Sequence, residues 1–288
     1  PDFRSPINRN PEVRDEPAKL AKRLISGKIL IFNGDEFAVN NSPELQLLEF
    51  SSHQIASKTI DDFIYLGEFE NVDYFLLFDK EHHNSSISWK NLRELTDFLP
   101  MYQYFLALHG QAIANWHSNN NYCHHCGAQT KIAKGGSVRI CEGESRELFP
   151  RTDPAIITLL YDQDERILLG RQSTWIENRY SNFAGFVEAG ESFEDAVTRE
   201  IKEEAGVDIV DIQYMGSQPW PFPQSAMIAF SARVLNPVQA KADGIEIESL
   251  RWYSRKELKT ALDNGSLTLP PRISVSRKMI ESWYGNQL

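Results

Sequence analysis

The chain has 288 residues and lacks the marks of a membrane, secreted or nucleic-acid-coating protein. It has no run of about 18 apolar residues, so no membrane span is expected. Its first residues, Pro1–Pro6, lack the apolar core of a signal peptide. Lysine and arginine total 30 against 40 acidic residues, a net charge of −10. That balance disfavours a general nucleic-acid surface, although a local basic pocket for a nucleotide stays open.

Cysteine is scarce, with three residues at positions 123, 126 and 141. An odd, clustered set is no disulfide framework; it favours a metal site or free thiols in a reducing compartment, so we expect a cytoplasmic protein. The chain also lacks Gly-x-Gly-x-x-Gly after a strand, which disfavours a dehydrogenase that uses a dinucleotide as a redox carrier. Repeats and low-complexity tracts are absent as well.

The overall composition, 41% hydrophobic and 24% charged, is that of a globular protein. At roughly 150 residues per domain, the length suggests about two domains. Residues 1–118 are interpreted as a β-rich domain that ends in an amphipathic helix over 101–117. Residues 119–149 would form a small knuckle, and 150–288 an α+β domain. The polar first 25 residues are expected to be frayed.

Hydrophobic periodicity predicts the main elements. Strands are expected at 29–32 and 37–39 around an Asn33-Gly34 turn, at 63–66, 74–78, 155–161 and 166–169, and near 211–216 and 226–235. Helices are expected at about 193–205, 254–264 and 274–284, and a polar loop at 81–86. His109 and His117 are interpreted as packing or surface residues rather than metal ligands.

The acidic helix at 193–205 carries the most information. At about 100° per residue, Glu200 and Glu204 lie on the same side as Ala196 and Val197, whereas Lys202 points away. Glutamates on a helix commonly form a solvated face, but these two lie on the side expected to pack inward. Carboxylates in such a place need a countercharge, and clustered hard oxygens without histidine or cysteine suit Mg²⁺ or Mn²⁺. Glu203, about 60° away from Glu200, can join the cluster.

The spacing of these residues is specific: Gly185-x5-Glu191-x7-Arg199-Glu200-Ile201-x-Glu203-Glu204-x-Gly206-Val207. It resembles the full Nudix box, the signature of hydrolases that act on nucleoside-diphosphate-linked compounds. Seven fixed residue types make a chance match roughly a one-in-a-million event. The resemblance implies the Nudix fold, a mixed β-sheet sandwiched between α-helices, here with an N-terminal β-rich domain and a zinc-ribbon-like knuckle.

The same resemblance implies roles for individual residues. Glu200, Glu203 and Glu204 would hold Mg²⁺ or Mn²⁺ on a pyrophosphate, and Arg199 and Glu191 would form a supporting ion pair. Ala184 is also expected at the metal, as is Glu246, unless Glu246 is a solvated loop carboxylate. The general base would be Glu203 or a carboxylate beyond the box.

A proline-rich nonapeptide follows the box by about ten residues. Its alternate prolines are expected to hold it extended and to present its aromatic side chains; a plain loop or a ligand for a peptide-binding domain is the alternative. The segment is similar to an array that marks the NADH pyrophosphatase branch of the Nudix hydrolases, Ser217-Gln218-Pro219-Trp220-Pro221-Phe222-Pro223-Gln224-Ser225. The resemblance runs from about Tyr122 to the C-terminus.

The branch implies hydrolysis of NADH or NAD⁺ to reduced or oxidised NMN plus AMP. Gln218 to Ser225 would line the substrate pocket, with Ser276 at its edge. Phe186 would stack on adenine, and Phe149 takes the place of a substrate-binding tyrosine. Some members remove NAD caps from RNA, which the −10 charge does not favour. A homodimer is implied by the branch alone.

The cysteine knuckle is incomplete relative to this branch. Cys123-x2-Cys126-x14-Cys141 has zinc-ribbon spacing, but the position of the fourth cysteine is Glu144. Two interpretations stay open. The knuckle is either a structural zinc site with three sulfurs and one carboxylate, or a metal-free unit held by packing.

Two further functions stay open at this point. One is a Nudix hydrolase for another dinucleotide, such as ADP-ribose or a dinucleoside polyphosphate, which the array at 217–225 disfavours. The other is a nucleotide-sensing module without turnover, which the intact box carboxylates disfavour.

Overall fold

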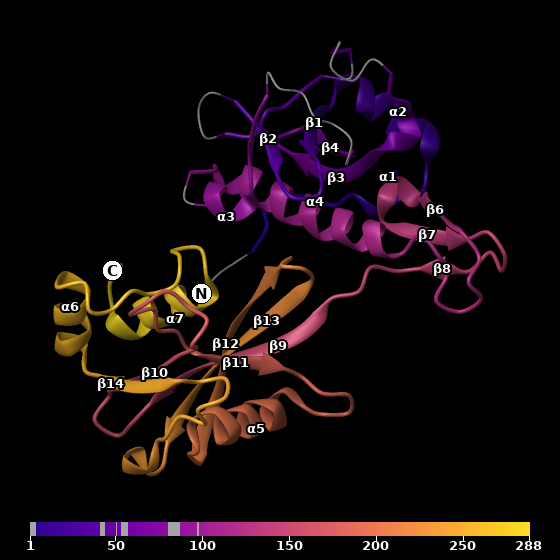
Figure 1. The fold of residues 1–288 in the computed structure, drawn as a ribbon. Helices are drawn as coiled ribbons and strands as arrows, with labels where there is room; N and C mark the ends of the chain where they lie inside the picture. The colour runs from indigo at the N-terminus through magenta and orange to yellow at the C-terminus, as the bar shows by residue number, and fades with distance from the viewer. Residues whose placement is uncertain (1–3, 41–43, 50, 53–56, 80–86, 97) are drawn as a thin grey trace. The chain divides into compact units, whose positions relative to one another are not determined.

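The computed structural model describes residues 4–40, 44–49, 51–52, 57–79, 87–96 and 98–288. These residues form two compact units. The N-terminal unit comprises 4–152 together with 221–224, and the C-terminal unit comprises 153–220 and 225–288. The N-terminal unit contains a five-stranded and a three-stranded sheet, and the C-terminal unit contains a six-stranded sheet (Figure 1). The polar loop predicted at 81–86 lies outside the described residues.

The N-terminal unit is built on a five-stranded sheet in the order β3-β4-β1-β2-β5. The predicted hairpin at Asn33-Gly34 is confirmed, because β1 and β2 pair antiparallel. β1 also pairs with β4 in parallel. The elements are α1 (Pro11–Arg14), α2 (Pro17–Ser26), β1 (Lys28–Phe32), β2 (Phe37–Val39), η2 (Ile60–Asp62), β3 (Phe63–Phe69), β4 (Val72–Phe78), β5 (Ser88–Lys90), α3 (Leu92–Leu95) and α4 (Met101–Asn119).

Residues 11–26 form two helices, α1 and α2, contrary to the prediction that this N-terminal region is frayed. Both α1 and α2 begin with a proline, which suits the first helical turn because the N–H it lacks has no partner there. Leu20 and Leu24 of α2 are buried in the core with Ile31 and Phe75 of the sheet. The polar residues that suggested fraying form the outward side of a short amphipathic helix.

The helix predicted over 101–117 is α4, and most of its side chains are buried. Gly110 lies against the sheet: a Cβ there would come within 3.2 Å of Leu76 Cδ1. The helix therefore packs closely on β4, and its faces carry the side chains that reach other parts of the unit.

The knuckle is a three-stranded sheet of β6 (Thr130–Ala133), β7 (Val138–Cys141) and β8 (Glu147–Leu148), with the short turn η3 (Lys134–Gly136) between β6 and β7. Arg139 of β7 is buried and donates to Thr130 Oγ1 at 2.6 Å. Its Nη1 lies 3.3 Å from Nδ1 of His117 at the end of α4. Burial lowers the pKa of His117 to about 4, so the imidazole is neutral. His117 is a packing residue, as predicted.

The C-terminal unit contains a six-stranded mixed sheet in the order β12-β13-β9-β10-β14, with β11 also paired to β9. β9 and β13 run parallel, and the other pairs are antiparallel. The elements are β9 (Asp153–Tyr161), β10 (Ile167–Arg171), β11 (Phe183–Phe186), α5 (Phe193–Ala205), β12 (Ile209–Trp220), β13 (Ser225–Val234), η4 (Pro237–Gln239), β14 (Ser249–Tyr253), α6 (Arg255–Asp263) and α7 (Val275–Tyr284).

Alternation along β9 sends side chains to both faces of this sheet. Ile157 and Leu159 pack in the core that includes residues of α6 and α7. Ile156 and Leu160 belong to the cores on the other face, which include residues of α5. The sheet is thus covered by α5 on one face and by α6 and α7 on the other (Figure 1). The predicted fold class, a mixed sheet between helices preceded by a β-rich domain, is confirmed.

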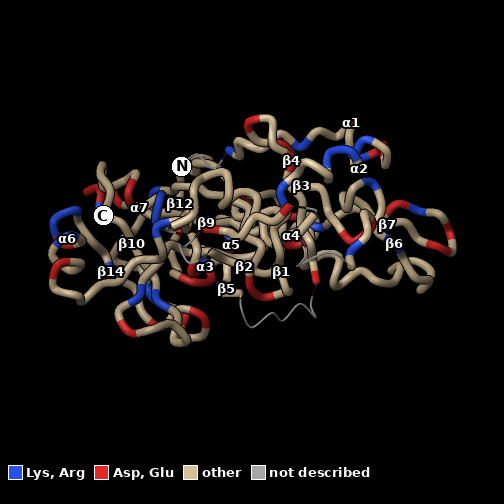
Figure 2. The backbone as a smooth tube through the Cα atoms, turned by 90° about the horizontal axis from the view of Figure 1, so that it is seen from above, with Lys and Arg blue, Asp and Glu red and all other residues tan. Residues whose placement is uncertain are grey.

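Charged residues of both signs are interspersed along the described chain (Figure 2). That distribution agrees with the ordinary charged fraction of the sequence and shows no long single-sign segment. Within the described residues, no helix is long and apolar enough to span a membrane.

Candidate active site

Helix α5 presents the acidic residues of the box. Its N-cap, Ser192, accepts the N–H of Asp195, and Gly206 ends it with φ 68°, a conformation that favours glycine. The inward side predicted for this helix is confirmed: Ala196 and Val197 are fully buried, and Glu204 is 3% exposed. Glu200 is half-buried on the same side.

Glu204 is the most unusual of these carboxylates. Its Oε2 is buried without a hydrogen-bond partner among the described residues, while the backbone N–H of Ala184 donates to the carboxyl group. Burial first, and then the charges of the nearby Glu200, Glu246 and Asp243, together raise the pKa of Glu204 to about 8. A buried acid among other acids requires a proton or a cation.

Arg199 holds the exposed side of this acidic group together. Its Nε and Nη2 donate to the two oxygens of Glu191 at 2.8 and 2.9 Å, a bidentate pair. Its Nη1 donates to Glu200 Oε1 at 2.8 Å and to Glu203 Oε2 at 3.1 Å. Its Nη2 also reaches the carbonyl oxygen of Phe186 at 3.0 Å. The predicted Arg199–Glu191 pair is therefore present, and it lowers the pKa of Glu191 to about 2.

Gly185 explains how Glu200 fits beside β11. A Cβ at this position would overlap the carboxylate of Glu200. The glycine of the box is therefore required by close approach and not by a special backbone angle. Burial raises the pKa of Glu200, and the guanidinium of Arg199 opposes that shift.

A loop before β14 brings Glu246 to the same group. Asp243 Oδ1 accepts the N–H of Ile247 at 2.8 Å, and its Oδ2 accepts the N–H of Glu246 at 3.0 Å. Burial opposes ionisation of Asp243, but these N–H groups outweigh it and lower its pKa. The charged Asp243 thus fixes the turn that carries Glu246, whose charge acts on both Glu200 and Glu204.

These residues fit a hard divalent cation. Carboxylate oxygens are the ligands that Mg²⁺ and Mn²⁺ prefer. The Oε2 of Glu204 has no hydrogen-bond partner among the described residues and is therefore available as a metal ligand. Glu200 and Glu203 are held by Arg199 rather than drawn together with Glu204. The arrangement is a preformed acidic group in which Arg199 holds the two outer members, Glu200 and Glu203.

The proline-rich nonapeptide divides into two parts. Ser217 to Trp220 form the end of β12 and pair with β13, Trp220 lying opposite Ser225. Pro221–Gln224 form a turn that groups with the N-terminal unit. The extended form predicted for the whole segment is confirmed for 217–220 and wrong for 221–224, because the chain reverses there to enter β13.

Two predicted substrate-pocket residues are buried and hold α7 in place. Gln218 is 1% exposed; its Nε2 donates to Ile273 O at 2.8 Å, and its Oε1 accepts the N–H of Val275 at 2.7 Å. Ser276 is 2% exposed, and its Oγ lies 2.8 Å from Ser181 Oγ. Gln218 thus fixes the loop that leads into α7, and Ser276 ties the start of α7 to Ser181.

Comparison with protein families identifies the fold and the box. The family model of the NUDIX domain matches residues 151–272, and that of the NADH pyrophosphatase-like rudimentary NUDIX domain matches 26–116. The first match contains the whole acidic group from Ala184 to Glu246. Residues 151–272 therefore form a NUDIX domain, which follows an NADH pyrophosphatase-like rudimentary NUDIX domain at 26–116.

Curated relatives in this family share much of the chain. The NAD-capped RNA hydrolase NudC of Mycobacterium bovis is 44% identical over 180 residues, which are 60% of this chain and 58% of that protein. The human NAD-capped RNA hydrolase NUDT12 is 35% identical over 185 residues, 60% of this chain and 40% of that protein. The chain therefore spans less than two thirds of the length of these relatives.

Among solved structures, a Nudix hydrolase from Nitrosomonas europaea matches with a TM-score of 0.43 and 20% identity. The match covers 58% of this chain and 94% of that one.

The knuckle before the NUDIX domain places its three thiols together. The sulfur atoms of Cys123, Cys126 and Cys141 all lie within 4.8 Å of one another, the one such set of three or more metal-ligand side chains in the described residues. The N–H groups of Cys126 and His125 lower the pKa of Cys123. The set could hold zinc. The carboxylate of Glu144 lies outside it and is 3.5 Å from Nε of Arg146, so its role as fourth ligand stays a prediction.

The remaining predicted residues are exposed aromatics. Phe186, at the end of β11, is 60% exposed, and Phe149, before β9, is 66% exposed. Large exposed aromatic side chains are available for stacking on a ligand. Their placement is compatible with the predicted contacts and does not test them.

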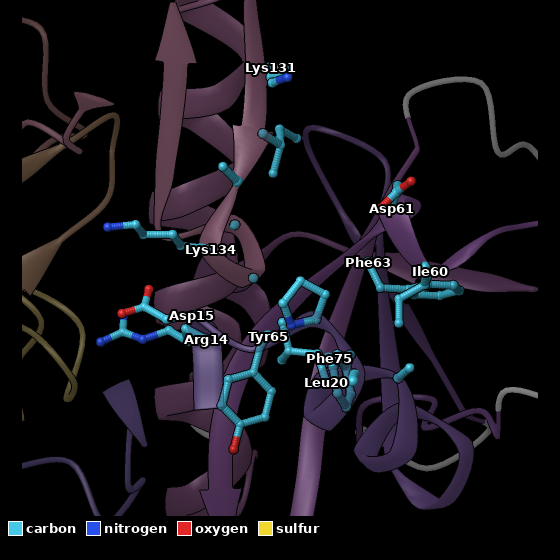
Figure 3. Close-up of a pocket in the computed structure, with 17 residues that line it drawn as sticks. Arg14, Asp15, Leu20, Ile60, Asp61, Phe63, Tyr65, Phe75, Lys131 and Lys134 are labelled. Carbon is cyan, nitrogen blue, oxygen red and sulfur yellow. The ribbon is translucent and has the colours of Figure 1, made fainter. Parts of the chain in front are cut away.

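The N-terminal unit also contains a cavity of about 810 Å³ (Figure 3). Leu20, Phe63, Tyr65 and Phe75 form its apolar side, and Lys134 also lines it. No residue predicted for the site lines it.

Sequence reasoning missed Asp243 and the links from Arg199 to Glu200 and Glu203. Asp243 could have been found, since an aspartate three residues before Glu246 next to Gly244 is typical of a turn. The links from Arg199 depend on side-chain conformations that spacing does not determine.

Proposed function

We propose that the protein hydrolyses the pyrophosphate of NADH or NAD⁺ to reduced or oxidised NMN plus AMP, with Mg²⁺ or Mn²⁺. The observation that carries this proposal is the buried, unpartnered oxygen of Glu204 within a group of carboxylates. The nonapeptide at 217–225, with the pattern of the NADH pyrophosphatase branch, supports the choice of substrate.

The chain's own residues have distinct roles in this proposal. Glu200, Glu203, Glu204 and Glu246 would hold the metal, together with the backbone at Ala184. A divalent ion bound there supplies a Lewis acid for phosphoryl oxygens and lowers the pKa of a bound water. Arg199 and Asp243 position the carboxylates that they contact.

Proton transfer is assigned to a carboxylate that reaches solvent. The side chain of Glu203 is 61% exposed, against 12% for Glu200, so Glu203 is the member of the box most open to water. A carboxylate beyond the box, such as Glu246, is the alternative. Phe186 would stack on adenine, and Trp220 and Phe149 would contact the remainder of the dinucleotide.

The relatives named NAD-capped RNA hydrolases extend the proposal to RNA that carries a 5′ NAD cap. A capped RNA presents the same pyrophosphate as free NAD, so one site could serve both. A structural zinc in the knuckle, a homodimer and a cytoplasmic location are also predictions of the resemblance and of the cysteine content.

The test is product analysis with purified protein and Mn²⁺, with and without EDTA. NADH, ADP-ribose and a short NAD-capped RNA are supplied in parallel, and products are resolved by chromatography. We expect metal-dependent AMP and reduced NMN from NADH. Turnover of ADP-ribose alone would refute the substrate assignment, and binding of NADH without turnover would refute the enzymatic one.

A further inference from the structure

The turn of the nonapeptide is held by side chains of α4. Gln111 Nε2 donates to the carbonyl oxygen of Pro221 at 2.9 Å. Asn115 Nδ2 lies 3.2 Å from the same oxygen and 2.9 Å from the carbonyl oxygen of Pro223. All four residues belong to the N-terminal unit.

These hydrogen bonds satisfy the carbonyl oxygens of the turn, which the pairing of β12 with β13 does not reach. The pairing of β12 with β13 ends at Trp220 and Ser225, so the carbonyl oxygens of the turn need other donors. Prolines have no N–H with which to form a compact turn of their own. Gln111 and Asn115 are four residues apart on one face of α4, a spacing that lets two side chains reach one short segment.

The burial of the Gln111 amide indicates that its contact with the turn matters. The residue is 8% exposed, and its Oε1 is buried with no partner among the described residues. A buried amide with one unsatisfied end is unfavourable for stability. An apolar side chain would pack there at lower cost, so the bond from Nε2 to Pro221 is the evident reason for glutamine.

A third contact holds the aromatic ring of the turn. The guanidinium of Arg93, in α3, lies 4.4 Å from the centre of the Phe222 ring, a cation–π geometry. Pro221 is buried. The carbonyl oxygens of Pro221 and Pro223 and the ring of Phe222 therefore contact protein, while the side chain of Pro223 is exposed.

We propose that Gln111 and Asn115 are positioning residues for substrate selection. Together they anchor the turn at 221–223, so that Ser217, Pro219 and Trp220 of the strand part are left to face substrate. The N-terminal unit thereby has a role in choosing the dinucleotide. This inference rests on the proposed function, in which the nonapeptide forms the substrate pocket.

The experiment uses variants that keep side-chain size and remove the donors: Gln111→Met, Asn115→Leu and the double variant. Asn119→Leu is the matched control, because this exposed amide of α4 donates to the carbonyl oxygen of Asn115 in its own helix. Steady-state kcat and KM for NADH are measured with Mn²⁺. Hydrogen exchange is measured in peptides that cover 217–225 and 185–207.

We expect KM for NADH to rise about five- to tenfold in each single variant, the range set by the loss of one or two net hydrogen bonds, and further in the double variant. The value of kcat should stay within about twofold, since the box is not touched. Exchange should become faster in 217–225 and stay unchanged in 185–207, and the control should match the wild type.

Unchanged KM and unchanged exchange in the double variant would overturn the proposal. So would a fall in kcat with unchanged KM, because it would show an effect on the reaction and not on substrate selection. If the double variant fails to fold, the single variants decide. If the wild type does not cleave NADH, the proposed function fails by itself, and exchange in 217–225 still decides whether the anchor exists.

Discussion

Replacing Glu204 by glutamine should stabilise the metal-free protein while removing its response to metal. Most substitutions of an active residue lower activity without a distinctive effect on folding. Here the buried carboxyl lies near Glu200, Glu246 and Asp243, and its Oε2 has no partner among the described residues. Without a cation, the ionised form is therefore unfavourable, and glutamine removes that ionisation while it keeps the size of the side chain.

The magnitude follows from the pKa of Glu204, which rises from an ordinary 4.5 to about 8 in the folded chain. Between these two values the folded protein retains a proton that the unfolded chain has lost. Unfolding therefore releases a proton, and the free energy of unfolding falls by about 1.4 kcal/mol per pH unit across this window. The accumulated penalty is about 1 kcal/mol at pH 5.5 and about 4 kcal/mol at pH 8.

The assay is thermal or urea unfolding of the C-terminal unit in EDTA at pH 5.5, 7 and 8. We expect Glu204→Gln to exceed the wild type in stability by a margin that grows by about 3 kcal/mol from pH 5.5 to pH 8. Adding Mn²⁺ should stabilise the wild type and leave the variant unchanged. Glu177→Gln, which alters an exposed glutamate of the same unit, serves as the control.

Either of two results would refute this reasoning. A variant less stable than the wild type at pH 8 in EDTA would show that the carboxylate has a partner in the folded chain. Equal stabilisation of both proteins by Mn²⁺ would show that the ion binds elsewhere.

Three further predictions concern the same unit and the knuckle. Gly185→Ala should weaken Mn²⁺ binding by about tenfold or more, measured by calorimetry, because the added methyl group displaces the carboxylate of Glu200. Asp243→Ala should weaken it by about fivefold in the same experiment, because the turn that carries Glu246 loses two hydrogen bonds; unchanged affinity would separate Glu246 from the site. If zinc is bound, Cys141→Ser should lower both the metal content and the melting temperature, with turnover per folded molecule unchanged; metal-free wild-type protein would favour a knuckle held by packing.

The box helix could be predicted closely from the sequence because local signals agree there. Ser192 caps α5, Gly206 ends it, and apolar residues recur at helical spacing between them. The inward side of the helix followed from the same periodicity. What spacing could not supply was the conformation of Arg199, whose guanidinium contacts three carboxylates.

The predictions for the N-terminal residues and for the turn at 221–224 were wrong because contacts with distant parts of the chain decide the structure there. The polar N-terminal residues fold because Leu20 and Leu24 find an apolar core in a sheet formed by later residues. The turn at 221–224 departs from an extended form because its carbonyl oxygens are bonded by Gln111 and Asn115, more than 100 residues earlier. No local signal announces such a partner.

Gln218 and Ser276 have contacts that their motif does not supply. Their place in the lining of a substrate pocket stays a prediction, and both side chains are buried and bonded to the segments around α7. A motif records which residues a site needs, and only the contacts show which of them hold the others in place.

We propose above that the carboxylates around Glu204 form a divalent metal centre for pyrophosphate hydrolysis. The most direct measurement is AMP release from NADH as Mn²⁺ is titrated into metal-free wild type and Glu204→Gln. We predict saturable, metal-dependent AMP release by the wild type and a rate about three orders of magnitude lower in the variant. AMP release in EDTA, or an equal response of the variant to Mn²⁺, would contradict the account.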